Sequence, residues 1–406
     1  MNHSSKDNSQ HSSPKAANSR TQGVGRLTIE AILSITNIVE SMHKRVSPLS
    51  TVKSSTEKEQ LSGISALVYR NIRNVTHGVG NSIDAPLATI SKMLASQPDS
   101  TSTQALLAAL NGVLGDHLVL SDNPLAIPMQ FRRDGQILDN GHLCELINQN
   151  NGKLLVMAHG LCMNDLQWSR EGHNHGAQLA KESGRAAIYL HYNTGLHISD
   201  NGKQFASLLE SLVNLTDKHL EISLLTHSMG GLVSRSAFHI AQSRSQKWPK
   251  LVKNLVFLGT PHHGADLEKA GNWVDLILGA HLYTIPLARL VKVRSSGITD
   301  LRYGNVQEVD WQTKDRFEFS GDQRLPLPLP ENVKCFAVAT SATESINYPL
   351  GDGLVRIKSA LGEHKNPAFN LHIPDNRKWV GANINHMQLL SDPEVYSVLK
   401  TWFEIE

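Results

Sequence analysis

The sequence predicts an α/β fold with a mostly parallel central sheet, and two observations lead to that prediction. From about residue 119 onward, short apolar segments alternate with segments of helical periodicity. Helices separate several of these apolar segments, and parallel strands need such crossover connections. We therefore expect helices on both faces of the sheet. The buried-strand candidates are residues 154–158, 187–192, 222–226, 255–258 and 333–339.

A hairpin precedes these strands. Residues 129–132 and 136–138 flank Asp134-Gly135. An Asp-Gly pair between two short strands is a strong hairpin signal, because both residues tolerate positive φ. The first two strands should therefore pair antiparallel at one side of the sheet.

The chain before residue 119 has a different pattern. Residues 1–25 are polar and poor in aromatic side chains, which predicts a disordered tail. Residues 26–118 show helical periodicity and predict a helical N-terminal region, and residues 119–406 form the α/β domain. Two interpretations of the helical region stay open: a layer packed on the α/β domain or on a second subunit, and a peripheral membrane or lipid-particle surface. The helical stretches after the first are residues 60–79, 85–95 and 104–113.

A long connection at about residues 265–331 predicts a cap or lid above the sheet. It contains apolar helical pieces at residues 273–278 and 287–293. A Leu-Pro alternation over residues 325–330 predicts a stiff, extended return to the next strand.

Composition limits the partners and the compartment. The formal charge is +2, and no long basic block with interleaved aromatic residues occurs, so nucleic acid is not an expected partner. Three widely spaced cysteines, Cys144, Cys162 and Cys335, indicate reduced thiols. The chain shows neither an apolar signal region at its start nor a membrane-spanning apolar run, so we expect a soluble, cytoplasmic protein. No nucleotide-binding glycine motif is present, and we expect no cofactor.

The most informative segment surrounds Ser228. The apolar run 222–225 leads directly to this serine, and an apolar helical stretch follows it. A sharp strand-to-helix turn of this kind is a nucleophile elbow, which holds the serine hydroxyl clear of the backbone. Gly230 occupies the small-residue position after the serine, whereas Thr226 stands where a glycine is usual. The alternative interpretation is that Ser228 caps the helix.

A serine nucleophile needs a base, an orienting acid and an oxyanion hole. In this fold the chain order is oxyanion loop, serine, acid, histidine. The best candidates in that order are Ser228, Asp352 and His386, with the backbone amides of Leu161 and Met229 as oxyanion donors.

Other residues compete for these and for metal-binding roles. Asp300 and Asp375 are alternative acids. Any of the three carboxylates is otherwise a solvent-exposed side chain in a turn, without a catalytic role. His173-Asn174-His175 and His262-His263 resemble metal-ligand pairs, but no cysteine or carboxylate stands at ligand spacing, so we predict no metal site.

Four patches carry a resemblance to known proteins. They are His159-Gly160-Leu161, Tyr192-Asn193-Thr194-Gly195, His227-Ser228-Met229-Gly230-Gly231 and Leu258-Gly259-Thr260-Pro261-His262-His263-Gly264. On these patches the chain resembles the α/β-hydrolase superfamily and, within it, lipase- and esterase-like proteins related to the GPI inositol-deacylase group. Asp352-Gly353-Leu354-Val355 resembles the acid loop of the same proteins. The resemblance covers roughly residue 119 to the C-terminus.

The resemblance implies a carboxylic ester hydrolase that works through an acyl-enzyme, with an apolar substrate under the cap. We expect Tyr192 and Trp273 to contact that substrate. An acyltransferase using the same three side chains, and a non-catalytic membrane- or partner-binding scaffold, are the alternatives. The oligomeric state stays open.

Overall fold

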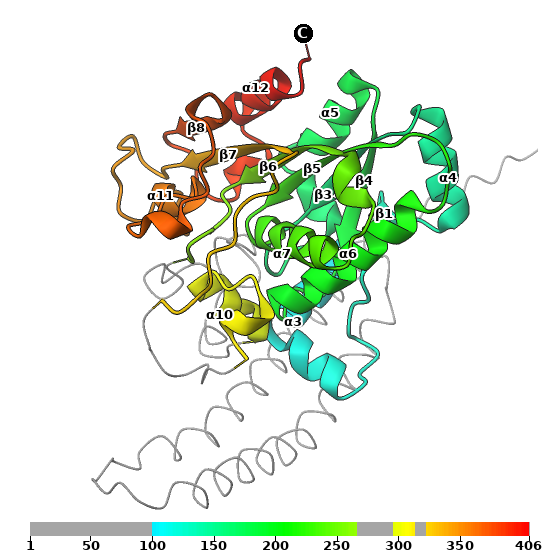
Figure 1. Cartoon of the computed structure of the whole chain (residues 1–406), viewed down its shortest axis with the longest axis horizontal. Helices are drawn as coiled ribbons and strands as arrows, with labels where there is room; N and C mark the ends of the chain where they lie inside the picture. The colour runs from blue at the N-terminus through cyan, green and yellow to red at the C-terminus, as the bar shows by residue number, and fades with distance from the viewer. Residues whose placement is uncertain (1–99, 266–294, 313–321, 406) are drawn as a thin grey trace, which may run out of the picture. The chain divides into compact units, whose positions relative to one another are not determined.

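The computed structural model describes residues 100–265, 295–312 and 322–405 (Figure 1). The chain divides into two compact units, Met1–Gln97 and Pro98–Glu406, and every described residue belongs to the second. The predictions for the tail, for the helices before residue 100, for Trp273 and for the two cap helices concern residues outside these ranges.

The described residues form one eight-stranded sheet in the order β2-β1-β4-β3-β5-β6-β7-β8. Strand β1 pairs antiparallel with β2 and β4, and all other neighbouring strands are parallel. The strands are β1 (Gln130–Arg133), β2 (Gln136–Ile137), β3 (Lys153–Ala158), β4 (Ala186–His191), β5 (Glu221–His227), β6 (Val252–Leu258), β7 (Lys334–Thr340) and β8 (Lys378–Gly381).

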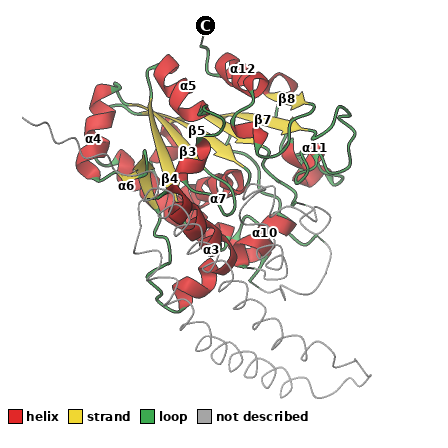
Figure 2. Ribbon diagram, turned by 180° about the vertical axis from the view of Figure 1, so that it is seen from behind, coloured by secondary structure: helices red, strands yellow, loops and turns green. Residues whose placement is uncertain are grey.

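Helices cover both faces of this sheet (Figures 1 and 2). Helices α6 and α7 pack against each other on one face, and α5 and α12 lie on the other. The α-helices are α3 (Thr101–Leu120), α4 (Asn140–Gln149), α5 (His175–Ser183), α6 (Ile198–Val213), α7 (Met229–Ser243), α10 (Ser296–Tyr303), α11 (Ile357–Ala360) and α12 (Pro393–Trp402). Together, the strand order, the two helical layers and the β5–Ser228–α7 turn define the predicted α/β-hydrolase fold.

The predicted hairpin is confirmed. Arg132 pairs with Ile137 and Arg133 with Gln136 across β1 and β2. The two residues between these strands, Asp134 and Gly135, have φ values of 51° and 78°. Positive φ at both central positions is the geometry of the type I′ turn, whose twist matches that of the strands it joins.

The five buried strands predicted from apolar runs are also confirmed, with ends shifted by at most three residues. Strand β5 shows the reason most clearly, since all its residues after Glu221 are buried. Strand β8 was missed. Its residues Lys378, Trp379 and Val380 are only half-buried at the edge of the sheet, so the sequence there lacks a continuous apolar run.

Helix α3 belongs to the same compact unit as the sheet. It contains the predicted helical stretch 104–113 and runs on to Leu120. This compact unit spans Pro98–Glu406 and so includes α3, while the domain boundary expected at residue 119 stays a prediction. Ser295 Oγ donates to the carbonyl of Gly112, 2.7 Å away, and the Ser296 amide donates to Asp116 Oδ2 at 3.0 Å. These bonds hold α3 beside α10 (Figures 1 and 2).

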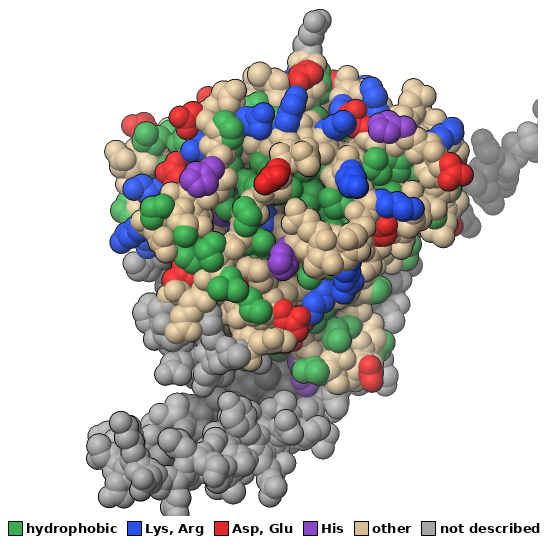
Figure 3. All heavy atoms as spheres, viewed as in Figure 1, with side chains coloured by type: hydrophobic (Ala, Val, Ile, Leu, Met, Phe, Trp, Pro, Cys, Tyr) green, Lys and Arg blue, Asp and Glu red, His purple; other side chains and the backbone are tan. Residues whose placement is uncertain are grey.

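Charged side chains of both signs are interspersed over the described part of the face drawn in Figure 3. Blue and red side chains alternate there with uncharged ones, in keeping with the small net charge of +2. No helix in the described ranges has both the length and the hydropathy to cross a bilayer.

The loop after β4 packs against α3 backbone to backbone. A Cβ atom at Gly195 would meet the carbonyl oxygen of Asn111 and would lie 2.7 Å from the amide nitrogen of Gly115. Close to this point, Asn193 Nδ2 donates to the Gly115 carbonyl at 3.0 Å. Because backbone atoms are the obstacle, no side-chain rotation can make room for a larger residue.

Replacement of Gly195 by Ala should therefore lower the free energy of unfolding by about 1–3 kcal/mol, the usual cost of overpacking. Gly141→Ala is the matched control, because a Cβ there meets only Asp139 Oδ1 at 3.2 Å. Urea unfolding of both variants measures the difference. Equal stability of the two variants would contradict the close contact between α3 and this loop.

Candidate active site

Ser228 lies at a strained turn between β5 and α7. Its backbone has φ 54° and ψ −122°, a conformation that costs a non-glycine residue of order 1–3 kcal/mol. The Ser228 amide donates to the Leu258 carbonyl at 2.9 Å, and its own carbonyl accepts from the Gly231 amide at 3.1 Å. These bonds fix the turn from both sides. Ser228 stands at the N-cap position of α7, as the alternative interpretation had it, but its side chain makes no capping hydrogen bond there.

The residues two positions before and after Ser228 explain how this turn packs. A Cβ at Gly230 would lie 2.8 Å from the His159 carbonyl oxygen and would also meet the Ala158 carbonyl. Only glycine therefore lets α7 approach the end of β3. Thr226 is fully buried, and its hydroxyl donates to the Val256 carbonyl of β6 at 2.8 Å. A threonine fits where glycine is usual because its one polar group is satisfied by the neighbouring strand.

The loop after β3 comes close to this serine. A Cβ at Gly160 would lie 3.0 Å from Ser228 Cβ. Two contacts hold the loop in place: Tyr192 Oη donates to the His159 carbonyl at 2.8 Å, and the Cys162 amide donates to Thr194 Oγ1 at 3.1 Å. In the described ranges, the amides of Leu161 and Met229 donate no hydrogen bond within the chain.

Asp352 and His386 are in direct contact. Asp352 Oδ2 lies 2.6 Å from His386 Nδ1, and both side chains are buried. The other carboxylate oxygen, Oδ1, accepts from the amides of Leu354 at 2.9 Å and Val355 at 2.7 Å. The His386 amide donates to the Asp352 carbonyl at 2.9 Å, so the two loops are joined by backbone as well as side chain.

This arrangement fixes the imidazole tautomer of His386. An ionised carboxylate only accepts hydrogen bonds, so Nδ1 must carry the proton that Asp352 accepts. Nε2 is then the basic nitrogen, and it is buried without a hydrogen-bond partner. No hydrogen bond joins Nε2 to the Ser228 hydroxyl in the described residues, and such contacts often tighten only when substrate binds.

Backbone contacts bring His386 to the end of the strand next to Ser228. A Cβ at Gly259, directly after β6, would lie 3.2 Å from His386 Cε1 and 3.1 Å from Asp352 Oδ2. The preceding residue, Leu258, accepts the Ser228 amide. Serine, histidine and aspartate therefore converge at the carboxyl ends of β5, β6 and β7, which is the edge where α/β sheets place their sites.

Two further histidines lie beside this group and are uncharged at neutral pH. Burial lowers the pKa of His159 to about 4, and burial together with the charge of His386 lowers the pKa of His227 well below its usual range. His227 Nε2 lies 3.0 Å from the His386 carbonyl oxygen, which makes His227 the donor that steadies the His386 loop. Sequence reasoning missed this contact, although His227 stands next to Ser228.

The alternative acids lie elsewhere and are otherwise engaged. Asp300 Oδ2 accepts from His197 Nδ1 and from the Ile198 amide, both at 2.9 Å. Asp375 is fully exposed and pairs with Lys378 at 3.4 Å. Of the three candidate carboxylates, the structure brings only Asp352 to His386.

The candidate metal ligands have structural contacts. His175 stacks on Tyr396 and lies 2.7 Å, ring nitrogen to ring nitrogen, from His173. Among the residues described, no group of three or more His, Cys, Asp or Glu side chains is arranged to hold a metal ion.

The hydroxyl of Tyr192 donates to the His159 carbonyl and the side chain is buried, so Tyr192 holds the loop after β3. Contact of Tyr192 with substrate stays a prediction. Sequence reasoning also missed the packing of α3 on that loop. A Cβ at Gly112 of α3 would lie 3.1 Å from the Cα of Cys162. Gly112 and Gly115, three residues apart on α3, are the sequence feature from which this contact was predictable.

Comparisons with known proteins give the following similarities. A family model described as a domain of unknown function, DUF7379, matches residues 127–301. No curated protein matches the chain. A lipase of Bacillus licheniformis, BlEst2 in its mature form, is similar in structure with a TM-score of 0.40 and 19% identity, over 62% of this chain and 92% of that one.

Two further structures are similar to a comparable extent. Lipase B of Aspergillus fumigatus has a TM-score of 0.38 and 10% identity, over 64% of this chain and 56% of that one. The RedJ thioesterase of the prodiginine biosynthetic pathway of Streptomyces coelicolor has a TM-score of 0.35 and 16% identity, over 63% and 86%. Similarities of this size do not establish function, so the function is argued from the geometry of the site.

Buried neutral histidines make the stability of this protein sensitive to acid. Burial, the largest cause in each case, lowers the pKa to about 4 for His159 and to about 3 for His175 and His191. Below pH 6.5 the unfolded chain binds protons at these positions while the folded chain does not. Stability is therefore present above pH 6.5 and is lost as the pH falls toward 4.

We predict that the free energy of unfolding decreases over this range by up to about 1.4 kcal/mol per pH unit for each such histidine. Urea unfolding at a series of pH values measures the slope. A free energy that stays level between pH 6.5 and 4 would show that these side chains are protonated in the folded state.

Proposed function

We propose that the protein is a serine hydrolase that cleaves carboxylic esters through an acyl-enzyme. The observation that carries this proposal is the convergence of a serine at a strained strand-to-helix turn with a buried imidazole–carboxylate pair. Strain at the Ser228 backbone costs free energy, and strain of this kind clusters at functional sites, where it is part of the mechanism.

In the proposed mechanism His386 Nε2 takes the proton from Ser228 as the hydroxyl oxygen attacks the ester carbonyl. Asp352 stabilises the imidazolium that forms and keeps the ring in the required tautomer. His386 then gives the proton to the departing alcohol, which leaves an acyl group on Ser228. Water, activated by the same imidazole, hydrolyses this acyl-enzyme and restores the serine.

The negative charge that develops on the carbonyl oxygen needs donors that are already in place. We assign this role to the backbone amides of Leu161 and Met229. Support comes from their lack of an acceptor in the described ranges and from the close approach of Gly160 to Ser228. The contacts of Tyr192 and Thr194 with the loop hold these donors in a fixed position.

We further propose an apolar acyl chain as the substrate group, from the apolar sequence of the cap at residues 265–324. Hydrolysis rates for p-nitrophenyl esters of graded acyl length measure this preference. We also propose, from the sequence alone, that the protein is related to GPI inositol-deacylases and that Trp273 contacts the substrate. A cytoplasmic location and membrane association through the N-terminal helices are further proposals from the sequence.

Replacement of Ser228 by Ala should abolish p-nitrophenyl ester hydrolysis and labelling by a fluorophosphonate probe, because both require the serine oxygen. Asp352→Asn and His386→Gln should lower kcat by on the order of 10⁴-fold. Ser243→Ala is the matched control, since Ser243 is exposed at the far end of α7. Full turnover by the folded Ser228→Ala protein would refute the mechanism.

Replacement of Gly160 by Ala tests the oxyanion loop separately. The added methyl would lie 3.0 Å from Ser228 Cβ and 3.1 Å from His227 Nδ1, so the loop must shift away. Loss of one oxyanion donor typically lowers kcat by about 10²- to 10³-fold. We expect that decrease in kcat with probe labelling retained at a reduced rate. An unchanged kcat would mean that this loop supplies no donor.

A further inference from the structure

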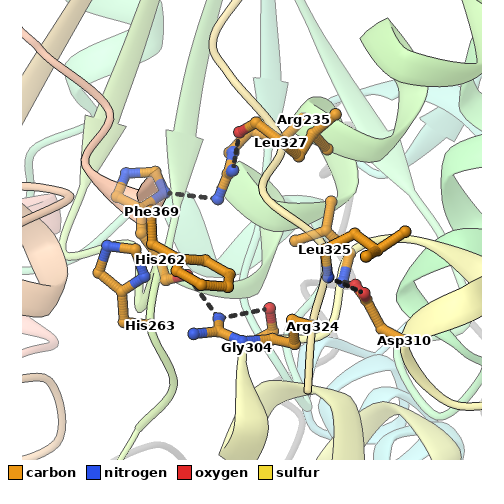
Figure 4. A pocket seen from close by; sticks show the side chains of 10 residues that line it. Arg235, His262, His263, Gly304, Asp310, Arg324, Leu325, Leu327 and Phe369 are labelled. Carbon is orange, nitrogen blue, oxygen red and sulfur yellow. Dashed lines mark hydrogen bonds between the residues drawn. The ribbon is translucent and has the colours of Figure 1, made fainter. Parts of the chain in front are cut away.

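A small pocket is lined by neither Asp352 nor His386, and its lining carries two arginines. It is bounded by α7, by the loop after β6 and by the return segment that begins at Asp322 (Figure 4). The space between its lining atoms is about 280 Å³, part of it open to solvent. The residues that line it are Arg235, His262, His263, Gly304, Val306, Asp310, Arg324, Leu325, Leu327 and Phe369.

Arg235 is the unusual member of this set. The residue is only 5% exposed, and no carboxylate of the described residues lies within ion-pair distance of it, although the charge of Asp310 acts to raise its pKa. Its guanidinium donates to the Leu327 carbonyl at 2.7 Å and contacts His262 Nδ1 at 3.4 Å, and Nε has no partner among the described residues. A guanidinium carries five N–H donors, so most of them lack an acceptor.

The cost of this arrangement is large for a structural residue. A buried charge without a partner destabilises a protein, and a well-packed apolar residue of similar size usually serves stability better. Burial lowers the pKa of Arg235 to about 10, so the side chain remains charged at neutral pH. Unsatisfied buried donors of this kind call for an acceptor that comes from outside the chain.

The other charged side chains of the pocket already have partners. Arg324 forms a two-pronged pair with Asp322, with both N–O distances 2.8 Å, and donates to the carbonyls of His262 and Gly304. The oxygens of Asp310 accept from the amides of Val306, Gln307 and Leu325. These three amides satisfy Asp310, the carboxylate among the described residues that line the pocket. Of the described cations there, Arg235 keeps N–H donors without an acceptor.

We propose that this pocket binds a phosphate-type oxyanion, held mainly by the guanidinium of Arg235. Arginine recognises phosphate and sulfate groups through paired N–H donors. His262 and His263 also line the pocket. Burial lowers the pKa of His263 to about 4 and that of His262 well below its usual range. As neutral rings they add donors or acceptors without a further charge.

The position of the pocket connects it to the proposed reaction. Arg235 is on α7, the helix that begins directly after Ser228. Seven residues of helix correspond to a rise of about 10 Å. His262 and His263 follow Gly259, whose backbone approaches Asp352 and His386. The anion has two sources: free inorganic phosphate, or a phosphoryl group of a substrate whose ester lies at Ser228.

Binding is tested on the whole protein without reference to turnover. Inorganic phosphate, compared with chloride at matched ionic strength, should raise the melting temperature, because a ligand that binds only the folded state stabilises it. Titration calorimetry then gives the Kd. The Ser228→Ala protein should bind phosphate equally, so this result does not depend on the proposed esterase activity. Absence of a phosphate-specific shift in the unmodified protein overturns the proposal.

Variants locate the ion. Arg235→Met should remove the phosphate-specific shift, and Arg235→Lys should weaken binding by at least about tenfold, because the ammonium cannot form paired hydrogen bonds. Arg244→Met is the matched control, since it removes one exposed positive charge from the end of the same helix. A shift of unmodified size in folded Arg235→Met or Arg235→Lys protein places the ion elsewhere and overturns the proposal.

A kinetic arm separates the two sources and rests on the proposed function. If the phosphoryl group of the substrate occupies the pocket, phosphate should inhibit hydrolysis of an ester that carries such a group. Arg235→Lys should then raise KM for that ester but not for a neutral p-nitrophenyl ester. Equal kinetics for both esters, together with phosphate binding, identifies the free ion as the ligand.

Discussion

The close approach of α7 to the end of β3 is the constraint on which the rest of the site depends. Gly230 permits it, because a side chain there would meet the carbonyls of Ala158 and His159. With α7 so close, the chain must reverse direction within one residue, and Ser228 takes up the strain with φ 54°. The same approach places Gly160 beside Ser228. Ser228 and the loop after β3 are thus positioned by a single backbone contact.

Hydrogen bonds between distant segments then keep the polar groups in place. Asp352 uses one carboxylate oxygen for two amides of its own loop and the other for His386, so its orientation is fixed before any substrate arrives. His227 adds a contact to the His386 carbonyl. Preorganised polar groups of this kind are effective in catalysis because they need not reorient during the reaction. Buried Arg235 shows the opposite condition, since its Nε has no hydrogen-bond partner among the described residues.

Much of the fold was predictable because its signals are local. Buried parallel strands are continuous apolar runs, and β3 to β7 were found in this way. The Asp134-Gly135 turn was recognised from two residues. Strand β8 was missed since it is short and half-buried. Helix α3 was predicted as a helix but not as a partner of the loop after β3, because its apolar residues do not identify the surface that they contact.

The sequence by itself determined the sheet, the turn at Ser228 and the chain order of the candidate site, since periodicity and turn chemistry depend on neighbouring residues. Only the tertiary structure decided which carboxylate meets His386, because the sequence allows Asp300, Asp352 and Asp375 alike as the acid. It also decided that Thr226 fits beside β6 and that Arg235 is buried without an ion pair to any described carboxylate. Such pairings join residues far apart in the chain, and they exist only once the sheet and its helices have packed together.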